Sequence, residues 1–336
     1  MRALITGITG QDGGFLANHL TDNGYEVYGL VRRSSSSHSV DLMKSRTGGR
    51  VRVVCGDVTD YQSIVNAVSE SKPDQVYNLA AQSHVGDSFN IPAYTSHVNG
   101  IGVLNVLEAT RLFAPCARFY QASTSELFGR TPPPQSEESI MHPRSPYGVA
   151  KLHGFWSVVN HRESRGMHAS NGILFNHESE YRGHDFVTRK ITMAVARIKF
   201  GKQDRLSLGN LNAKRDWGYA GDYVEAMRLI VEHDRPGDWV VATGTTRTVR
   251  DFLETAFAYA GMEVESNGAA GTDEFYFDKK TGRPVVTVDP AFYRPSEVDV
   301  LCGDASKISS TLGWKPKTTF DDMVRKMMEN DFSNAR

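Results

Sequence analysis

A glycine-rich turn close to the start of the chain constrains its fold more than any other feature. The turn, Gly7-Ile-Thr-Gly-Gln-Asp-Gly13, directly follows a short apolar run and opens an amphipathic stretch. Glycine lets the backbone approach a pyrophosphate closely, and the N-terminus of the next helix supplies free N–H donors and a positive dipole end. This position favours a dinucleotide-binding site over an ordinary turn. The expected cofactor contacts in the turn are Gly7, Thr9, Gly10, Gln11, Asp12 and Gly13.

Short β-rich runs alternate with longer amphipathic stretches through the first half of the chain. We expect strands at residues 2–6, 26–31, 51–55, 75–80 and 118–122, and helices at 14–23, 61–70 and 99–113. Each helix is long enough to carry a right-handed crossover between parallel strands. The sequence thus predicts an α/β fold with a doubly wound parallel sheet of the Rossmann type, whose ligands bind outside the carboxyl ends of the strands.

The regular alternation ends near residue 176, which predicts a smaller C-terminal lobe that binds substrate. We expect a basic amphipathic helix at 188–202 and another helix near 249–261. The stretch 266–284 carries glycines and charges without an apolar period. We expect a surface insertion there.

The same change of pattern sets the expected domain boundaries. We assign residues 1–176 to the dinucleotide-binding domain and 177–330 mainly to the substrate-binding lobe. Segments near 214–235 and 290–305 are expected to rejoin the first domain, because chains of this kind recross between lobes.

Composition excludes several other classes of protein. The chain has 38 basic and 39 acidic residues, a net charge of −1, which argues against a nucleic-acid or membrane-surface partner. Its three cysteines form no CxxC pair, so a disulfide framework and a structural metal site are not expected. No apolar run reaches the roughly 18 residues of a membrane span, and the N-terminal run is too short for a signal peptide. We therefore expect a cytoplasmic protein without a metal.

The end of the second expected strand indicates which dinucleotide is bound. An NAD site places an acidic residue there, about 20 residues past the glycines. This chain has Arg32-Arg33-Ser34 instead, two guanidiniums and a hydroxyl that suit a 2′-phosphate. NADP is therefore favoured, the alternative being a solvated charged pair. Five further cofactor contacts follow the third and fourth strands, the first two near the adenine and the others near the nicotinamide ribose: Asp57, Val58, Leu79, Ala80 and Ala81.

A Tyr-x-x-x-Lys pair points to proton transfer coupled to hydride chemistry. Tyr147 and Lys151 follow Ser145-Pro146, so they lie four residues apart on one face of a helix. A phenol with a pKa near 10 is a poor base at neutral pH unless a cation favours the phenolate. We expect Lys151 to do this and to reach the cofactor ribose. The pair alone is weak evidence, but together with the glycine turn it becomes strong.

A carboxylate directly after the fifth expected strand points to a further reaction step. The motif is Ser123-Thr-Ser-Glu126. A plain alcohol oxidation needs only a hydroxyl there, so Glu126 requires an explanation. Oxidation of a sugar C4 hydroxyl to a ketone acidifies the C5 hydrogen, and a nearby carboxylate can remove it and assist loss of the C6 hydroxyl as water. Glu126 therefore favours dehydration, the alternative being a carboxylate that caps the next turn.

These motifs together resemble the extended short-chain dehydrogenase/reductase superfamily and, within it, the GDP-mannose 4,6-dehydratase family. The resemblance runs from Thr6 to about Pro316. Its more specific motifs lie beyond the glycine turn and the Tyr-x-x-x-Lys pair: Tyr77-Asn-Leu-Ala-Ala-Gln-Ser83, Phe175-Asn-His-Glu-Ser179, Phe186-Val-Thr-Arg-Lys190, Lys214-Arg-Asp-Trp217 and Arg294-Pro-Ser-Glu297.

The resemblance implies an activity and a set of site residues. It implies an NADP-dependent conversion of GDP-mannose to GDP-4-keto-6-deoxy-mannose and assembly into a homodimer or homotetramer. The implied catalytic residues are Thr124, Glu126, Tyr147 and Lys151, of which the last two also contact the cofactor. The implied substrate contacts are Ser83, Ser123, Glu126, Asn176, Lys190, Gly209, Arg215, Arg294 and Glu297.

Some points remain open at the level of the sequence. Where the family commonly continues Asn-His-Glu-Ser with Pro and a basic or aliphatic residue, this chain has Glu180-Tyr181, which puts the local loop shape in doubt. A larger sugar such as a manno-heptose is an alternative substrate. An epimerase or reductase of the same superfamily leaves Glu126 without a task, and a non-catalytic NADP-sensing protein leaves Tyr147 and Lys151 without one.

Overall fold

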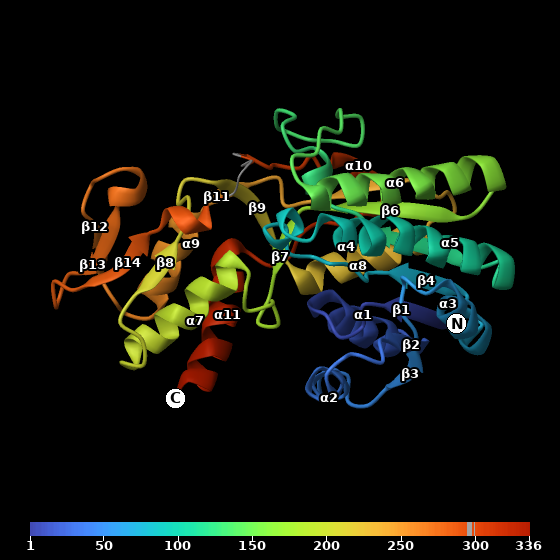
Figure 1. Cartoon of the computed structure of the whole chain (residues 1–336), viewed down its shortest axis with the longest axis horizontal. Coiled ribbons are helices and arrows are strands. Elements are labelled where there is room, and N and C mark those ends of the chain that lie inside the picture. The colour runs from blue at the N-terminus through green and yellow to red at the C-terminus, as the bar shows by residue number, and fades with distance from the viewer. Residues whose placement is uncertain (294–297, 299) are drawn as a thin grey trace.

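The computed structural model describes residues 1–293, 298 and 300–336 and shows two lobes side by side (Figure 1). The larger lobe is built on a seven-stranded sheet in the order β10-β6-β5-β4-β1-β2-β3, all of whose pairs are parallel. This confirms the predicted doubly wound α/β fold. The strands are β1 (Arg2–Thr6), β2 (Glu26–Val31), β3 (Val51–Cys55), β4 (Gln75–Asn78), β5 (Arg118–Ala122), β6 (Ala169–Leu174) and β10 (Asp238–Val241).

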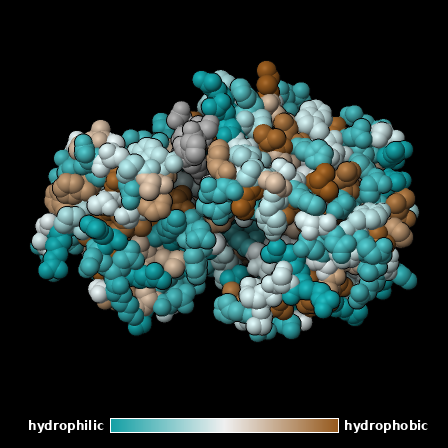
Figure 2. Space-filling view, in the orientation of Figure 1, coloured by the Kyte–Doolittle hydropathy of each residue, from teal (hydrophilic) through white to brown (hydrophobic). Residues whose placement is uncertain are grey.

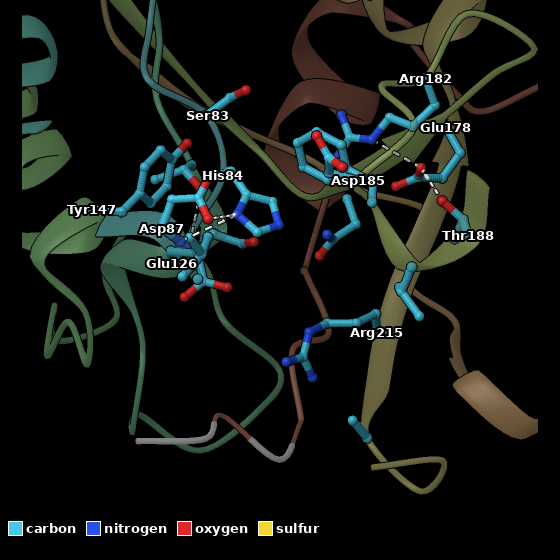
Figure 3. A pocket seen from close by; sticks show the side chains of 18 of the residues that line it. Ser83, His84, Asp87, Glu126, Tyr147, Glu178, Arg182, Asp185, Thr188 and Arg215 are labelled. Carbon is cyan, nitrogen blue, oxygen red and sulfur yellow. Dashed lines mark hydrogen bonds and ion pairs between the residues drawn. The ribbon is translucent and has the colours of Figure 1, made fainter. Parts of the chain in front are cut away.

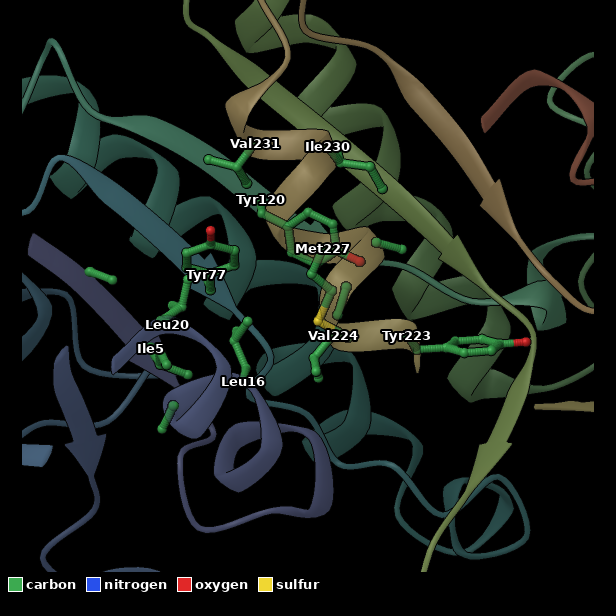
Figure 4. Close-up of a cluster of buried hydrophobic side chains, with 14 of the residues drawn as sticks. Ile5, Leu16, Leu20, Tyr77, Tyr120, Tyr223, Val224, Met227, Ile230 and Val231 are labelled. Atoms are coloured by element: carbon green, nitrogen blue, oxygen red, sulfur yellow. The ribbon is translucent and has the colours of Figure 1, made fainter. Parts of the chain in front are cut away.

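Helices cover both faces of this sheet. Alternate residues of β1 enter different cores, because successive side chains of a strand point to opposite faces. Ala3 and Ile5 pack beneath α1 and α8, in the cluster drawn in Figure 4, whereas Leu4 packs in the cluster that contains residues of α3 and α5. The helices of the large lobe are α1 (Gln11–Asp22), α2 (Ser37–Arg46), α3 (Tyr61–Ser71), α4 (Pro92–Ser96), α5 (Gly102–Phe113), α6 (Pro146–Arg165), α8 (Ala220–Glu232) and α10 (Ser306–Leu312).

Helix α6 carries the Tyr-x-x-x-Lys pair and begins as its sequence predicts. Pro146 occupies the first turn, where its missing N–H costs nothing, and the Ser145 hydroxyl accepts a hydrogen bond from the Gly148 N–H at 3.0 Å. This N-cap fixes where the helix starts and therefore where Tyr147 lies. Short helical turns precede it at Asp87–Phe89, His97–Ile101 and Ser125–Leu127.

Among the described residues, the smaller lobe contains two short sheets and three helices. One sheet has the order β11-β9-β7 and the other β12-β13-β14-β8. Helices α7, α9 and α11 pack on them around a second apolar cluster. The elements are β7 (Asn176–Glu178), α7 (Val187–Lys199), β8 (Leu206–Leu208), β9 (Lys214–Tyr219), β11 (Thr246–Thr248), α9 (Val249–Tyr259), β12 (Val264–Ser266), β13 (Phe275–Asp278), β14 (Pro284–Val288) and α11 (Phe320–Ala335), with single turns at Gly271–Asp273 and Pro290–Phe292.

The expected surface insertion at 266–284 does lie largely at the surface, but part of it forms strands. The segment contributes β13 and the end of β12 to the four-stranded sheet, with Tyr276 buried. Glu274 is also buried and forms an ion pair with Arg250 of α9. The Glu274 charge is neutralised by a residue from outside the segment. The number of charges within 266–284 therefore does not show that part of the segment forms a strand.

Several segments cross between the lobes. Residues 214–235 supply β9 to the smaller lobe and α8 to the larger one, and β10 joins the edge of the seven-stranded sheet. The segment 290–305 is only partly described. The boundary at residue 176 stays a prediction. None of the helices in the described part of the chain is long and apolar enough to cross a membrane.

Candidate active site

Two connected pockets lie at the carboxyl edge of the large sheet, where Figure 2 shows the surface hollowed between the lobes. The glycine-turn pocket, about 430 Å³, is lined by residues 7 and 9–13 and by the ends of β2, β3 and β4. The interlobe pocket, about 620 Å³, lies between the ends of β5 and β6 and the smaller lobe. Both pockets are lined by Asp12, Leu79, Ala81, Ser83 and Arg182.

The glycine turn has no room for larger side chains. Gly7 has a φ of +71°, and a Cβ there would lie 2.8 Å from the Ala80 backbone nitrogen. A Cβ on Gly13 would lie 2.6 Å from the Gly7 carbonyl oxygen. No side chain caps the start of α1 at Gly10, so its first N–H groups are open to a bound anion. This bare, closely packed turn fits a dinucleotide pyrophosphate.

The adjoining wall holds most of the predicted cofactor contacts. Asp57, Val58, Leu79, Ala80 and Ala81 all line the glycine-turn pocket.

At the end of β2, the wall differs in part from the sequence prediction. Arg32 and Ser35 line it, whereas Arg33 and Ser34 are exposed and do not. Arg32 donates a hydrogen bond to the Tyr94 hydroxyl at 3.2 Å, and Tyr94 also lines the pocket. Tyr94 lies in α4 and belongs to no recognisable motif, so sequence reasoning missed it.

The four predicted catalytic residues come together at the base of the interlobe pocket. Thr124, Glu126, Tyr147 and Lys151 all line it and are buried. The Thr124 hydroxyl accepts a hydrogen bond from the Glu126 N–H at 3.2 Å, so threonine, not the glutamate, caps the turn after β5. Glu126 is thereby placed in the pocket wall beside Tyr147 (Figure 3).

Burial controls the ionisation of this group. It raises the pKa of Tyr147 to about 12, although a hydrogen bond with Thr124 acts in the opposite direction. The Lys151 ammonium lies 5.8 Å from the centre of the Tyr147 ring and donates to the Ala122 carbonyl at 2.9 Å. Burial lowers the pKa of Lys151 to about 8. Desolvation of the phenolate outweighs the contacts that stabilise it, so the net pKa of Tyr147 lies above its usual value, and the role expected for Lys151 stays a prediction.

Sequence reasoning missed a buried ion pair that joins the two lobes. His177, at the centre of β7, lies with Nε2 2.8 Å from the Asp12 carboxylate in the glycine turn. Burial opposes both charges, but their attraction outweighs it, so the pKa of His177 is raised and that of Asp12 lowered. The Tyr223 ring stacks on His177 at 4.6 Å. The two charged residues are 165 positions apart, so no local spacing could reveal the pair.

Arg182 is the other functional candidate that the sequence did not reveal. It lines both pockets and forms an ion pair with Glu178 at 3.0 Å, as Figure 3 shows. Its guanidinium lies 3.7 Å from the centre of the Phe186 ring. Thr188 donates to the same carboxylate at 2.5 Å. Arg182 is thus held at the junction of the pockets, where it can contact a phosphate.

The interlobe pocket also contains most of the predicted substrate contacts. The residues that line it are Ser83, Ser123, Glu126, Asn176, Lys190, Gly209 and Arg215. The Ser123 hydroxyl is buried and makes no hydrogen bond within the described chain. Lys190 lies with its ammonium 5.2 Å from the centre of the Phe292 ring. Arg294 and Glu297 lie outside the described residues.

This arrangement can hold a dinucleotide against a polar substrate. A phenol, a hydroxyl and a carboxylate line the interlobe pocket together, and two cations, Lys190 and Arg215, line the same pocket. The chemistry available is proton transfer to and from a substrate whose anionic part lies toward the smaller lobe.

Comparison with known proteins supports this assignment along nearly the whole chain. The family profile described as GDP-mannose 4,6 dehydratase matches residues 4–327. The GDP-mannose 4,6-dehydratase of Sinorhizobium fredii is 50% identical over 99% of this chain and 97% of its own. The human GDP-mannose 4,6 dehydratase is 48% identical over 99% of this chain and 92% of its own.

A solved structure shares the fold at lower identity. The UDP-glucose 4-epimerase of Thermus thermophilus, in complex with NAD, superposes with a TM-score of 0.82 at 24% identity, over 98% of this chain and 99% of that one. At this identity it shows the fold alone. The profile and the relatives, which span nearly the whole chain, show more: the chain belongs to the GDP-mannose 4,6-dehydratase family of hydro-lyases.

Proposed function

We propose that the chain converts GDP-mannose to GDP-4-keto-6-deoxy-mannose with NADP as a recycled cofactor. The observation that carries the proposal is the position of Glu126 in the pocket wall with Thr124 and Tyr147. An epimerase or a reductase of this fold requires the hydroxyl and the phenol but gives the carboxylate no task. A dehydratase requires all three.

The residues present fit NADP. Gly7, Gly10 and Gly13 provide the close backbone approach that a pyrophosphate needs, and Arg32 offers a guanidinium where a 2′-phosphate would lie. Arg182, which lines both pockets and is held by Glu178, can turn its guanidinium toward a cofactor phosphate. Bound NADP supplies a hydride acceptor for the oxidation and a hydride donor for the later reduction.

The proposed proton transfers belong to this chain's own residues. Tyr147 accepts the proton of the C4 hydroxyl while Thr124 holds that oxygen, and Lys151 supports the resulting phenolate. Glu126 removes the C5 proton, made acidic by the C4 ketone, and returns it to the C6 hydroxyl, which leaves as water. After hydride addition at C6, C5 takes up one proton, which balances the one accepted by Tyr147.

The outer part of the interlobe pocket suits a nucleoside diphosphate. Lys190 and Arg215 are the cations proposed to face the pyrophosphate, with Asn176 and Ser123 nearer the sugar. Arg294 and Glu297 stay in the proposal as predicted contacts of the ribose or guanine.

A turnover experiment tests the proposed substrate. The protein is incubated with NADP and GDP-mannose, and the sugar is followed by NMR. We expect a C4 ketone and a C6 methyl group. Turnover of GDP-manno-heptose but not of GDP-mannose would replace the proposed sugar, and epimerisation without a methyl group would contradict dehydration.

We also propose that the protein is a cytoplasmic homo-oligomer. Val149 and Trp156 lie seven residues apart on one face of α6 and are each more than half exposed, at 57% and 55%. Ile101, in the turn that packs against α6, is exposed as well. An apolar face of this kind marks an interaction surface. Cys55, Cys116 and Cys302 are free thiols, which fits a reducing compartment.

A further inference from the structure

Residues 177–182, the interlobe strap, connect the glycine turn to the smaller lobe. On the cofactor side, the Gln11 side chain donates to the His177 carbonyl at 3.1 Å and accepts from the Ser179 hydroxyl at 2.8 Å. The strap ends at Arg182, which lines both pockets. Its position therefore affects the cofactor side and the substrate side together.

The strap is anchored to the smaller lobe at Glu180. The carboxylate of Glu180 accepts a hydrogen bond from the Tyr219 hydroxyl at 3.2 Å. Its carbonyl accepts from Arg189 of α7 and from Asn330 of α11. The backbone next to Tyr181 is thus held by three elements of the second lobe.

Tyr181 extends from this anchored backbone to the first lobe. Its ring lies 5.4 Å from the Phe15 ring of α1, and the Arg46 guanidinium lies 4.0 Å from its centre. The Nε of Arg46 is buried and has no hydrogen-bond partner among the described residues. The face of the Tyr181 ring and the charge of the nearby Glu180 carboxylate together stabilise that guanidinium.

Arg46 is the last residue of α2, the helix that follows the wall formed by Arg32 and Ser35. Of the ten residues of α2, all of which are described, Met43 alone is buried. The Asn18 amide also holds the end of the helix, by donating to the Arg46 carbonyl at 3.0 Å. A helix with so little buried surface depends on such contacts at its end for its position.

We propose that Tyr181 is a positioning residue that makes the protein prefer NADP to NAD. The inference rests on the proposed function, in which Arg32 faces the 2′-phosphate. By fixing Arg46, Tyr181 holds α2 and with it the loop that presents Arg32. A loop ordered before binding loses less entropy when it contacts the phosphate. NAD has no 2′-phosphate and relies on the glycine turn, so it gains nothing from this order.

Binding measurements on the full chain test the inference. Dissociation constants for NADP and NAD are measured by titration calorimetry for the wild type, Tyr181→Ala, Tyr181→Phe and Arg46→Met. We expect Tyr181→Ala and Arg46→Met each to weaken NADP binding about fivefold and to leave NAD binding within about twofold. Tyr181→Phe keeps the aromatic face and should bind like the wild type. The double variant Tyr181→Ala/Arg46→Met should lose no more NADP affinity than either single variant, because both substitutions remove the same contact.

A matched control separates selectivity from stability. Lys307 lies 4.9 Å from the centre of the Trp239 ring, away from both pockets, so Lys307→Met removes a similar contact without changing either affinity. Equal losses for NADP and NAD, or no loss, would overturn the role of Tyr181. If Tyr181→Ala does not fold, the NADP and NAD affinities of Arg46→Met decide whether the contact sets the preference. Arg46→Met is expected to fold, because Arg46 lies at the end of a short outer helix.

Arg32→Ala distinguishes this inference from the proposed function. If Arg32→Ala weakens NADP binding selectively but Tyr181→Ala does not, only the positioning role is wrong. If Arg32→Ala weakens the binding of NADP and NAD equally, Arg32 does not contact the 2′-phosphate. The assignment in the proposed function is then wrong, and the role of Tyr181 that rests on it is wrong as well.

Discussion

At the scale of single residues, burial sets the ionisation of the candidate catalytic groups. The phenol of Tyr147 and the ammonium of Lys151 are both moved toward their neutral forms, with pKa values of about 12 and 8. Each charged form is penalised by removal from water. The proposed reaction therefore depends on bound ligands to stabilise the phenolate.

The shifted pKa of Lys151 makes the stability of the free protein depend on pH. In the unfolded chain this lysine keeps its charge up to a pKa near 10.5, but in the folded protein it loses it near 8. The folded state thus binds fewer protons between these values, and its stability rises with pH across that window. We expect Lys151→Met to stabilise most at pH 7, on the order of 3 kcal/mol before the lost hydrogen bond is counted, and less at pH 10. A difference in melting temperature that does not change with pH would contradict this.

Tyr147→Phe tests the proton-transfer role. It removes the phenolic proton acceptor but keeps the ring, so we expect kcat to fall by roughly 10²- to 10⁴-fold. NADP affinity should fall much less than kcat, since the glycine turn is untouched and only the contact of the phenol hydroxyl with the cofactor is lost. Steady-state kinetics and cofactor titration provide the two readouts, and a fall in affinity with a normal kcat would reverse the assignment.

At the scale of elements, the chain was predictable where one local signal decides the structure. β1, β2, β3 and β5 begin and end where the sequence predicts, because each is a short run containing β-branched or aromatic residues between turn or helical segments. β6 and β10 were not predicted; β10 is a four-residue run that pairs with β6 at the edge of the sheet.

The candidate site divides in the same way. Thr124, Glu126 and Tyr147 belong to local motifs and were predicted, and all three line the interlobe pocket. His177 and Arg182 depend on partners brought together by folding, and the sequence did not reveal them. Burial, which raises the pKa of Tyr147, could not be predicted from the spacing of Tyr147 and Lys151.

The N-cap of α6 links element stability to the site. Ser145→Ala removes the hydrogen bond to the Gly148 N–H, which should cost about 1 kcal/mol in urea unfolding. Because Tyr147 lies in the first turn, kcat should fall as well. Ser164, whose hydroxyl bonds the Asn160 carbonyl near the other end of α6, provides the control: Ser164→Ala should change neither quantity much. Equal effects of the two variants would argue against a role for the cap.

At the scale of the whole molecule, the two lobes meet through the site itself. Residues at the ends of the large sheet line the glycine-turn pocket and one side of the interlobe pocket, and residues of the smaller lobe line the other side of the interlobe pocket. The Asp12–His177 pair and the strap connect the lobes close to these residues. Cofactor and substrate sites are therefore expected to influence each other, reciprocally.

The exposed apolar face of α6 predicts the assembly. Trp156→Glu places a charge in the proposed contact between copies, so we expect the mass measured by light scattering to fall toward that of a monomer. Ile140→Glu changes another exposed apolar residue outside α6, 79% exposed, and should leave the mass unchanged. An unchanged mass for Trp156→Glu would place the contact elsewhere.

Deuterium incorporation tests the central claim, that Glu126 carries the dehydration. Wild type and Glu126→Gln are incubated with NADP and GDP-mannose in deuterated water, and the sugar is followed by NMR. We predict a C4 ketone, a C6 methyl group and deuterium at C5 for the wild type, and neither a methyl group nor C5 deuterium for Glu126→Gln, with NADP affinity retained. Normal methyl formation by Glu126→Gln would contradict the account, because the C5 proton would then be removed by another group.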